Sequence, residues 1–416
     1  MSQSSLNNSS PMTAHSNHKP IFLKLKVLQL QRILVLSALS LSNVTLASPL
    51  NIQGFLSSSI TKTNHASPYI ETKEYADNIN YQSGTVVGIM LSKRLDSKVN
   101  FQGQLTARGA EPDNSNAYKP EFDLLFIDYK LRPNISVKVG KLIPNTYLIS
   151  KHLDVGASYL WARPPVEVYE TSYSFLTRVN GVELTYQRKL GNYNFRIHPY
   201  VGRLNETLIS RTTRTVASLD SESLAGFSVE LETQGFHLHA SAMRADSIMT
   251  DGDGSLVKMP ETAIYSLGAK AELNGWLALA EVAHVDVGKS KLDFTSSDID
   301  EVRQLGALET DIPPQTGYYV TLAREIKAFT PYLTLAGTNA TQKLSSNNTL
   351  NDINSNFLQE QQSLSLGTRY YASNSLTLKF EYHHVDILNG TTGLFITQPS
   401  EDDDLQLWTA SFNILF

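Results

Sequence analysis

Hydrophobic and polar residues alternate along most of the chain, in segments that suit strands of about ten residues. Clear examples are residues 98–108, 193–203 and 376–383. A period of two places successive side chains on opposite faces of a β-strand, whereas a helical pattern would repeat every 3.6 residues. The pattern therefore predicts an all-β fold of many strands of similar length.

The joints between these segments are of two kinds, which alternate along the chain. Seven short joints carry turn-forming residues or link two segments directly: Asp96-Ser97, Arg132-Pro133-Asn134, Gly191-Asn192, Gln234-Gly235, Asn274-Gly275, Lys327-Ala328 and Ser373-Asn374-Ser375. Eight long polar stretches lie between them: 63–84, 109–121, 143–177, 204–222, 247–261, 288–315, 340–362 and 386–404. Together these joints separate sixteen segments.

This alternation of joints favours a membrane barrel over a soluble β-sandwich. In a sandwich, short and long connections are not segregated to opposite ends. A membrane barrel has tight turns on the periplasmic side and long loops outside, and lipid tolerates no open sheet edge. We therefore expect a closed transmembrane antiparallel β-barrel of about 16 strands.

The two faces of each strand predict which side chains meet lipid and which meet the lumen. The apolar set is expected outside and the polar set inside, with an aromatic girdle beside the short turns. Strand 276–286 is ambiguous, and Glu281 is assigned to neither face. Strand parity gives these candidates for the pore wall: Arg94, Arg108, Asp128, Lys130, Lys138, Glu183, Arg196, Arg369, Lys379 and Glu381.

The first 47 residues are typical of an export signal. They contain Lys19, Lys24, Lys26 and Arg32 but no acidic residue, and the apolar run ILVLSALSL follows. A small residue, Ala47, stands at the expected cleavage point. We predict a signal peptide over 1–47, with a polar extension that leaves Met1 or Met12 as the start, and a barrel over 48–416.

Composition supports an exported envelope protein. Only 18% of the 416 residues are charged, cysteine is absent, and the mean hydropathy is −0.20. Removal of residues 1–47 takes away four basic residues and no acidic one, which makes the net charge of −5 four units more negative. The absence of cysteine excludes disulfides and thiolate metal sites, and the acidic balance gives no reason to expect nucleic acid as a partner.

Several segments resemble a known family. The C-terminal stretch LWTASFNILF resembles the last strand of outer-membrane barrels, and it places Trp408, Phe412 and Phe416 on one face. The segment LNIQGFLS (50–57) resembles the first strand of Gram-negative general porins. Residues 101–170, with FQGQLTARG and VKVGKLIPNTYLISKHLDVGASYLWARPPVEVYE, resemble porin-like outer-membrane proteins of marine gammaproteobacteria.

The resemblance implies a location in the Gram-negative outer membrane, in contact with lipid and lipopolysaccharide. It also implies a sixteen-stranded barrel, usually a homotrimer, that passes small hydrophilic solutes. It further implies that Trp408, Phe412 and Phe416 form the signal that the barrel-assembly machinery reads. In general porins the third long loop narrows the pore. Here that loop is 143–177, stiffened by Pro164 and Pro165, and its charged candidates are Lys151, Asp154, Arg163, Glu167 and Glu170.

Other functions receive less support from the sequence. A substrate-selective facilitator remains the main alternative, and an outer-membrane barrel enzyme the next, although no Ser/His or Asp/His set is legible and no G-x-S-x-G or P-loop motif occurs. His237-x-His239 lacks carboxylate partners at a recognisable spacing, and the adjacent His383 and His384 cannot share a strand face. We therefore predict no catalytic activity, no cofactor and no metal. The sequence leaves anion or cation preference open.

Overall fold

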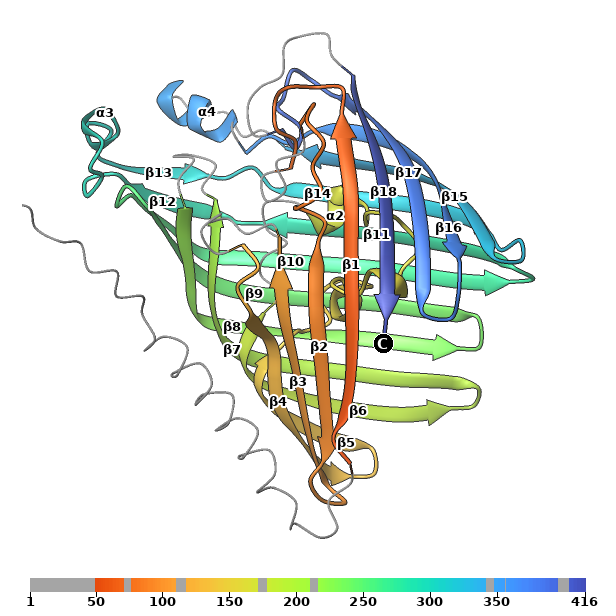
Figure 1. Ribbon diagram of the computed structural model, residues 1–416. Coiled ribbons are helices and arrows are strands. Elements are labelled where there is room, and N and C mark those ends of the chain that lie inside the picture. The colour runs from red at the N-terminus through yellow and green to blue at the C-terminus, as the bar shows by residue number, and fades with distance from the viewer. Residues whose placement is uncertain are drawn as a thin grey trace, which may run out of the picture. The chain divides into compact units, whose positions relative to one another are not determined.

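The computed structural model describes residues 49–70, 76–109, 117–170, 178–209, 216–341, 348–355, 357–395 and 404–416. The predicted signal peptide lies outside the described residues. Within them, no helix is long and apolar enough to cross a membrane. The domain that begins at Pro49 consists mainly of antiparallel strands (Figure 1).

The strands run in chain order around one continuous sheet. They are β1 (Asn51–Thr63), β2 (Val86–Arg94), β3 (Val99–Arg108), β4 (Glu121–Arg132), β5 (Ile135–Leu142), β6 (Val179–Leu190), β7 (Tyr193–Ile209), β8 (Val216–Thr233), β9 (Phe236–Asp251), β10 (Leu256–Leu273), β11 (Trp276–Asp286), β12 (Lys289–Asp293), β13 (Ala307–Asp311), β14 (Gln315–Arg324), β15 (Phe329–Ala340), β16 (Gln361–Tyr371), β17 (Leu376–Ile387) and β18 (Leu405–Leu415). The short helices are η2 (Ser150–His152), η3 (Gly156–Ser158), α2 (Val166–Tyr169), α3 (Asp300–Arg303) and α4 (Asn348–Ser355).

The sheet closes because β1 pairs with both β2 and β18. The pairs Phe55↔Gly88 and Phe55↔Leu415 flank the same residue of β1. No sheet edge remains between the first and last strands, which is the condition for a barrel in lipid. The predicted closed antiparallel barrel is confirmed.

Sixteen barrel strands account for the eighteen strand segments, because β12 and β13 continue β11 and β14. β12 pairs with β10 in the register that β11 began, and β13 pairs with β12 in the register of the β11–β14 ladder. The interruption lies at Gly288, whose φ of +66° breaks the extended backbone. The predicted strand number is therefore confirmed.

All seven predicted short joints connect consecutive barrel strands. In the β10–β11 turn, Asn274 and Gly275 both have positive φ, as a two-residue hairpin turn of type I′ requires. Two of the eight predicted long joints are wrong. The stretches 204–222 and 247–261 are mostly strand, because β7 pairs with β8, and β9 with β10, well past the expected ends. The stretch 288–315 also carries β12, α3 and β13, and 340–362 carries α4.

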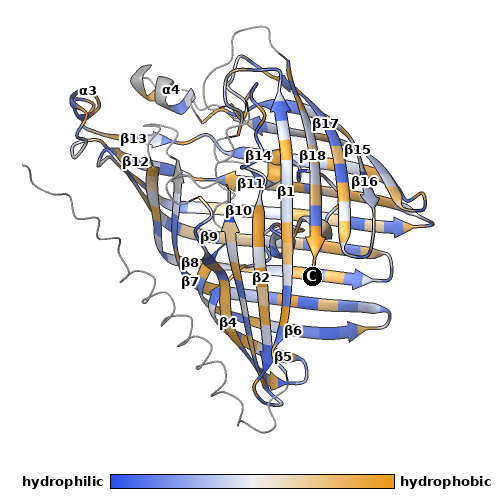
Figure 2. Cartoon of the chain, in the orientation of Figure 1, coloured by the Kyte–Doolittle hydropathy of each residue, from blue (hydrophilic) through white to orange (hydrophobic). Residues whose placement is uncertain are grey.

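The predicted strand faces agree with the observed burial. Along β17, Phe380 is 53% exposed on the outer side, whereas Thr377, Lys379, Glu381 and His383 are buried. Figure 2 shows the same alternation of hydrophobic and hydrophilic positions along the strands. Exposed aromatic side chains stand beside the short turns, as predicted for the girdle: Tyr129, Tyr193, Trp276 and Phe329. Trp408, Phe412 and Phe416 are also exposed.

Candidate functional site

The segment 143–170, here called the inner loop, lies inside the barrel. It connects β5 towards β6 and contains η2, η3 and α2 (Figure 1). Its residues contact inward-facing side chains on opposite walls, including Glu230 of β8 and Lys379 of β17. The remaining part of the predicted loop, 171–177, lies outside the described residues.

The two ends of the inner loop meet at Glu281 of β11. The backbone N–H of Leu148 donates a hydrogen bond to Glu281 Oε1 at 2.8 Å, and Ser266 of β10 donates to the same oxygen at 2.7 Å. The hydroxyl of Tyr169 donates to Glu281 Oε2. Glu281 is only 3% exposed, so its carboxylate faces inward and joins the beginning of the loop to its end. The strand that the sequence left ambiguous therefore holds a principal contact of the loop.

The start of the loop is also fixed to β8 and β9. Asn145 donates to the carboxylate of Glu230, and Ser241 donates to the carbonyl oxygen of Thr146 at 2.6 Å. His239 Nε2 lies 3.3 Å from that same carbonyl oxygen. His239 therefore belongs to the contact between loop and wall.

The middle of the loop is held by the ammonium group of Lys379. Lys379 Nζ donates to the carbonyl oxygens of Gly156, Tyr159 and Trp161 at 2.6, 2.9 and 2.6 Å. The same Nζ lies 4.1 Å from the ring centroid of Tyr159. A compact ammonium group with three donors suits three converging carbonyls. Lys379, predicted as a pore-wall charge, is thus buried by the loop.

Two glycines allow the loop to approach the wall closely. A Cβ at Gly156 would lie 1.9 Å from Asn413 Oδ1 of β18, and one at Gly317 of β14 would lie 1.8 Å from the carbonyl oxygen of Glu167. Gly156 N also donates to Ser57 Oγ of β1 at 3.0 Å. A larger residue at Gly317 would meet the backbone of Glu167 and push the loop away from the wall, whereas one at Gly156 would first displace the side chains of Asn413 and Ser57.

The indole of Trp161 is buried against β14 and β15. Its Nε1 lies 3.0 Å from the hydroxyl oxygens of both Thr321 and Thr334 and donates toward them. The N–H of Ala162 donates to the hydroxyl of Tyr332, which itself donates to Glu381 at 2.8 Å. These contacts extend the loop's attachment from β17 across to β14.

Two predicted loop charges are also bound by the wall. Arg163 Nη2 lies 3.6 Å from Glu381 Oε1. In α2, Glu167 accepts hydrogen bonds from Ser363 at 2.6 Å and Gln361 at 2.9 Å, both on β16. Burial raises the pKa of Glu167. Glu170 lies at the end of α2 and is partly buried.

A second charged group lies on the β3–β4 side. Arg108 Nη2 lies 2.8 Å from Asp154 Oδ2 of the inner loop and also pairs with Asp123. Arg178 Nε lies 2.9 Å from Asp123 Oδ1. Parity did not identify Asp123, because the β3–β4 register shifts between Gln104 and Leu105.

A third charged group runs along β5 to β8. Lys138 Nζ pairs with Glu183 at 2.5 Å, and Arg196 pairs with Glu230 at 2.6 Å. Lys151 of the loop also interacts with this group. Burial lowers the pKa of Lys151, and the nearby negative charge of Glu183 opposes that shift. Glu230 was not among the predicted residues, although its strand position on β8 has the inward parity.

The other predicted wall residues lie near the short-turn end of the barrel. They are Arg94, Asp128, Lys130 and Arg369. Arg369 lies 3.8 Å from Glu325, next to the β14–β15 turn, and its guanidinium lies 4.6 Å from the ring centroid of Tyr371. The structure therefore separates the predicted wall residues into those that contact the inner loop, those whose ion pairs run along β5 to β8, and those near the turns.

Comparisons with known proteins bear on the fold. No family model and no curated protein matches the chain. Among solved structures, Salmonella typhi OmpF in complex with daunomycin has a TM-score of 0.54 at 13% identity, covering 89% of this chain and 100% of that one. The DcaP outer-membrane channel of Acinetobacter baumannii has a TM-score of 0.54 at 10% identity, covering 88% and 97%.

A third solved structure has a similar fold. The anion-selective porin from Comamonas acidovorans has a TM-score of 0.52 at 12% identity, covering 89% of this chain and 100% of that one. Similarity at such low identity concerns the path of the backbone. The porin resemblance in the sequence is thus confirmed at the level of architecture, and the chain has the fold of outer-membrane porins.

Proposed function

We propose that this protein is an outer-membrane porin, a water-filled channel through which small hydrophilic solutes diffuse passively. The observation that carries the proposal is the inner loop, which lies within a closed sixteen-stranded barrel and is bonded to opposite walls. A barrel of this size without a loop would leave a wide aqueous channel. A loop fixed across it narrows the passage and sets its size limit.

The charges around the loop support weak ion selectivity. Arg108 faces Asp123 and Asp154, Lys138 faces Glu183, and Arg196 faces Glu230 and Glu232. Opposite charges at such short range cancel much of each other's field at a distance. We therefore propose a size-limited, weakly selective channel rather than a facilitator for one solute.

The remaining features follow from the same proposal. Residues 1–47 act as the export signal, the apolar outer wall contacts lipid and lipopolysaccharide, and three copies associate as a homotrimer. Trp408, Phe412 and Phe416 serve the barrel-assembly machinery. Lys151, Asp154, Arg163, Glu167 and Glu170 belong to the constriction, partly by holding its shape.

Conductance across planar lipid bilayers tests the proposal. Purified protein should insert in steps of uniform size, with a current proportional to salt concentration and a reversal potential near zero in a salt gradient. Saturable block of the current by one sugar or one anion would favour a selective facilitator instead. A folded protein that inserts but conducts no ions would refute channel function.

A further inference from the structure

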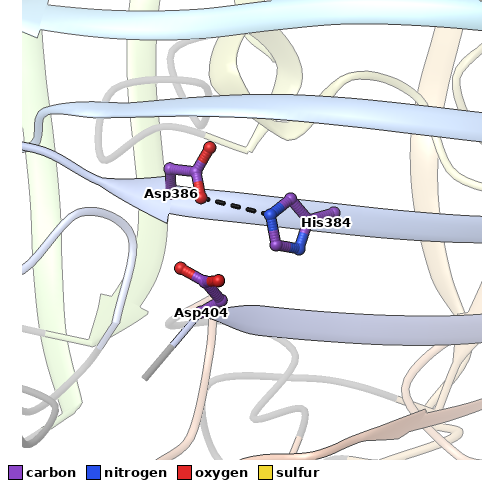
Figure 3. A group of neighbouring side chains, drawn as sticks. All are labelled: His384, Asp386 and Asp404. Carbon is purple, nitrogen blue, oxygen red and sulfur yellow. Dashed lines mark ion pairs between the residues drawn. The ribbon is translucent and has the colours of Figure 1, made fainter. Parts of the chain in front are cut away.

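Three potential metal ligands converge at the end of β17 and β18 remote from the short turns. They are His384 and Asp386 of β17 and Asp404, which precedes β18 (Figure 3). One ligand atom from each lies within 4.8 Å of those of the other two. His384 Nε2 is 3.1 Å from Asp386 Oδ1.

The register of the sheet brings these side chains together. His384 and Asp386 are two residues apart, so they share one face of β17. The pair Val385↔Leu405 ends the β17–β18 ladder, which places Asp404 opposite Asp386, one position beyond it. This face is the outer one, because Phe380 and Trp408 on the same face are exposed.

The backbone at Asp404 is held from a third strand. Asn64, directly after β1, donates from Nδ2 to the carbonyl oxygen of Asp404 at 2.9 Å. The N–H of Gln406 donates to Asn64 Oδ1 at 2.8 Å. The backbone of Asp404 is therefore anchored beside the end of β1.

An ion pair alone does not account for this arrangement. One carboxylate, that of Asp386, is enough to pair with His384. Asp404 adds a second carboxylate, directly across the strands from Asp386. Like charges at opposed positions of a sheet destabilise it. A bound cation would convert this repulsion into shared coordination.

We propose that His384, Asp386 and Asp404 bind a divalent transition-metal ion of the Zn²⁺ type on the outer rim of the barrel. One imidazole nitrogen and two carboxylate oxygens suit Zn²⁺, whereas Ca²⁺ and Mg²⁺ prefer oxygen ligands alone. Water completes the coordination. The site is independent of channel function, because it lies on the outer face and shares no residue with the inner loop.

The chain contains its own matched control. The tripeptide His284-Val285-Asp286 of β11 repeats the sequence His384-Val385-Asp386. There, however, His284 Nδ1 lies 2.8 Å from Thr316 Oγ1, and Asp286 stands opposite Ala263 instead of a second carboxylate. A His-x-Asp pair is present at both places, but among the described residues only the β17 pair has a third ligand.

Calorimetric titration of the purified, untagged, chelator-treated protein with ZnCl₂ tests the proposal. We expect saturable binding of one Zn²⁺ per chain that weakens at least about tenfold in both His384→Gln and Asp404→Asn. His284→Gln should bind as the unchanged protein does. The two near-isosteric variants should keep the far-ultraviolet circular dichroism of the barrel, so loss of binding is distinguishable from loss of folding.

Two results would overturn the assignment. The first is equal Zn²⁺ affinity in the unchanged protein, His384→Gln and Asp404→Asn, or no saturable binding in any of them. The second is Ca²⁺ binding as tight as Zn²⁺ binding, which would contradict the role of the imidazole ligand. A conductance failure, by contrast, would refute the proposed channel and leave the metal titration unaffected.

Discussion

Replacing Lys379 by methionine should release the middle of the inner loop from β17. Methionine keeps the length and much of the volume of the lysine side chain but donates no hydrogen bond. The carbonyl oxygens of Gly156, Tyr159 and Trp161, at 2.6, 2.9 and 2.6 Å from Nζ, would all lose their donor. The hydrogen bonds at Glu281 would remain, so the barrel should still fold.

The size of the effect follows from the charge on the donor. A hydrogen bond to a charged group contributes about 1.5–3 kcal/mol, and part of the three-bond total is offset because a buried ammonium group is costly to desolvate. A net loss of about 3 kcal/mol at this contact would lower the ratio of docked to released loop roughly 100-fold. A docked state favoured by a few kcal/mol would then exchange visibly with a released one.

Single-channel recording in planar bilayers measures this exchange. Lys379→Met should show larger mean conductance and added current fluctuations, together with faster tryptic cleavage after Lys151. Lys130→Met is the matched control, since it removes an exposed lumen charge near a short turn and should leave the fluctuations unchanged. If Lys379→Met gave the same conductance, noise and cleavage rate as Lys130→Met, the loop would not be held by this lysine.

Three further substitutions test other contacts of the loop. Gly317→Ala should displace α2, because its Cβ would lie 1.8 Å from the carbonyl oxygen of Glu167, and the thermal midpoint should fall by several degrees. Glu167→Gln should stabilise the protein at pH 7 but not at pH 4. Because burial raises the folded-state pKa of Glu167, its carboxyl contributes most to the free energy of unfolding at low pH, where it is protonated. That contribution declines as the pH rises above the unfolded-state pKa of about 4.3. Asp154→Asn should weaken the contact with Arg108 and shift the reversal potential in a salt gradient toward anion preference, because it leaves a lumen cation less compensated.

Each of these has a control and a contrary result. Gly103→Ala introduces a Cβ whose nearest neighbour is a flexible leucine methyl at 3.2 Å, so it should lower the thermal midpoint much less than Gly317→Ala. Equal decreases in the two variants would contradict the close approach of α2 to β14. For Glu167→Gln, the free energy of unfolding measured across pH 4–8 should depend less on pH than in the unchanged protein. An unchanged pH profile would contradict the raised pKa of Glu167. For Asp154→Asn, an unchanged reversal potential would mean that Asp154 lies outside the conducting path.

The barrel could be predicted from sequence because lipid imposes a simple rule on each strand. Where one face meets lipid and the other meets water, alternation is strict, as in β17. The alternation is weaker towards the strand ends remote from the short turns, and there the prediction failed. β7 and β8 continue through 204–209 and 216–221 as paired backbone, although the polar residues of that stretch resemble a loop.

Inside the barrel, the rule fails where the inner loop replaces water. Leu277, Leu279, Ala283 and Val285 face inward on β11 and are buried, so this strand has apolar residues on both faces. Glu281 could not be assigned for that reason, yet it binds both ends of the loop. Asp123 was missed for a different reason: a β-bulge between β3 and β4 changes the parity at its position.

Parity identifies which charged residues point inward, but it does not identify what they meet there. Arg108, Lys379 and Glu381 were predicted as pore-wall charges, and each is inward, but each is engaged by the inner loop. Their partners in the loop are backbone carbonyls and the side chains of Asp154 and Arg163, and the positions of these groups depend on how the loop folds. A loop that follows most of the inner wall needs such contacts at many strands, because its own helices are only three or four residues long. The polar inner face of this barrel therefore holds the inner loop in place, and under the proposed channel function substitutions there are expected to alter channel size as readily as ion preference.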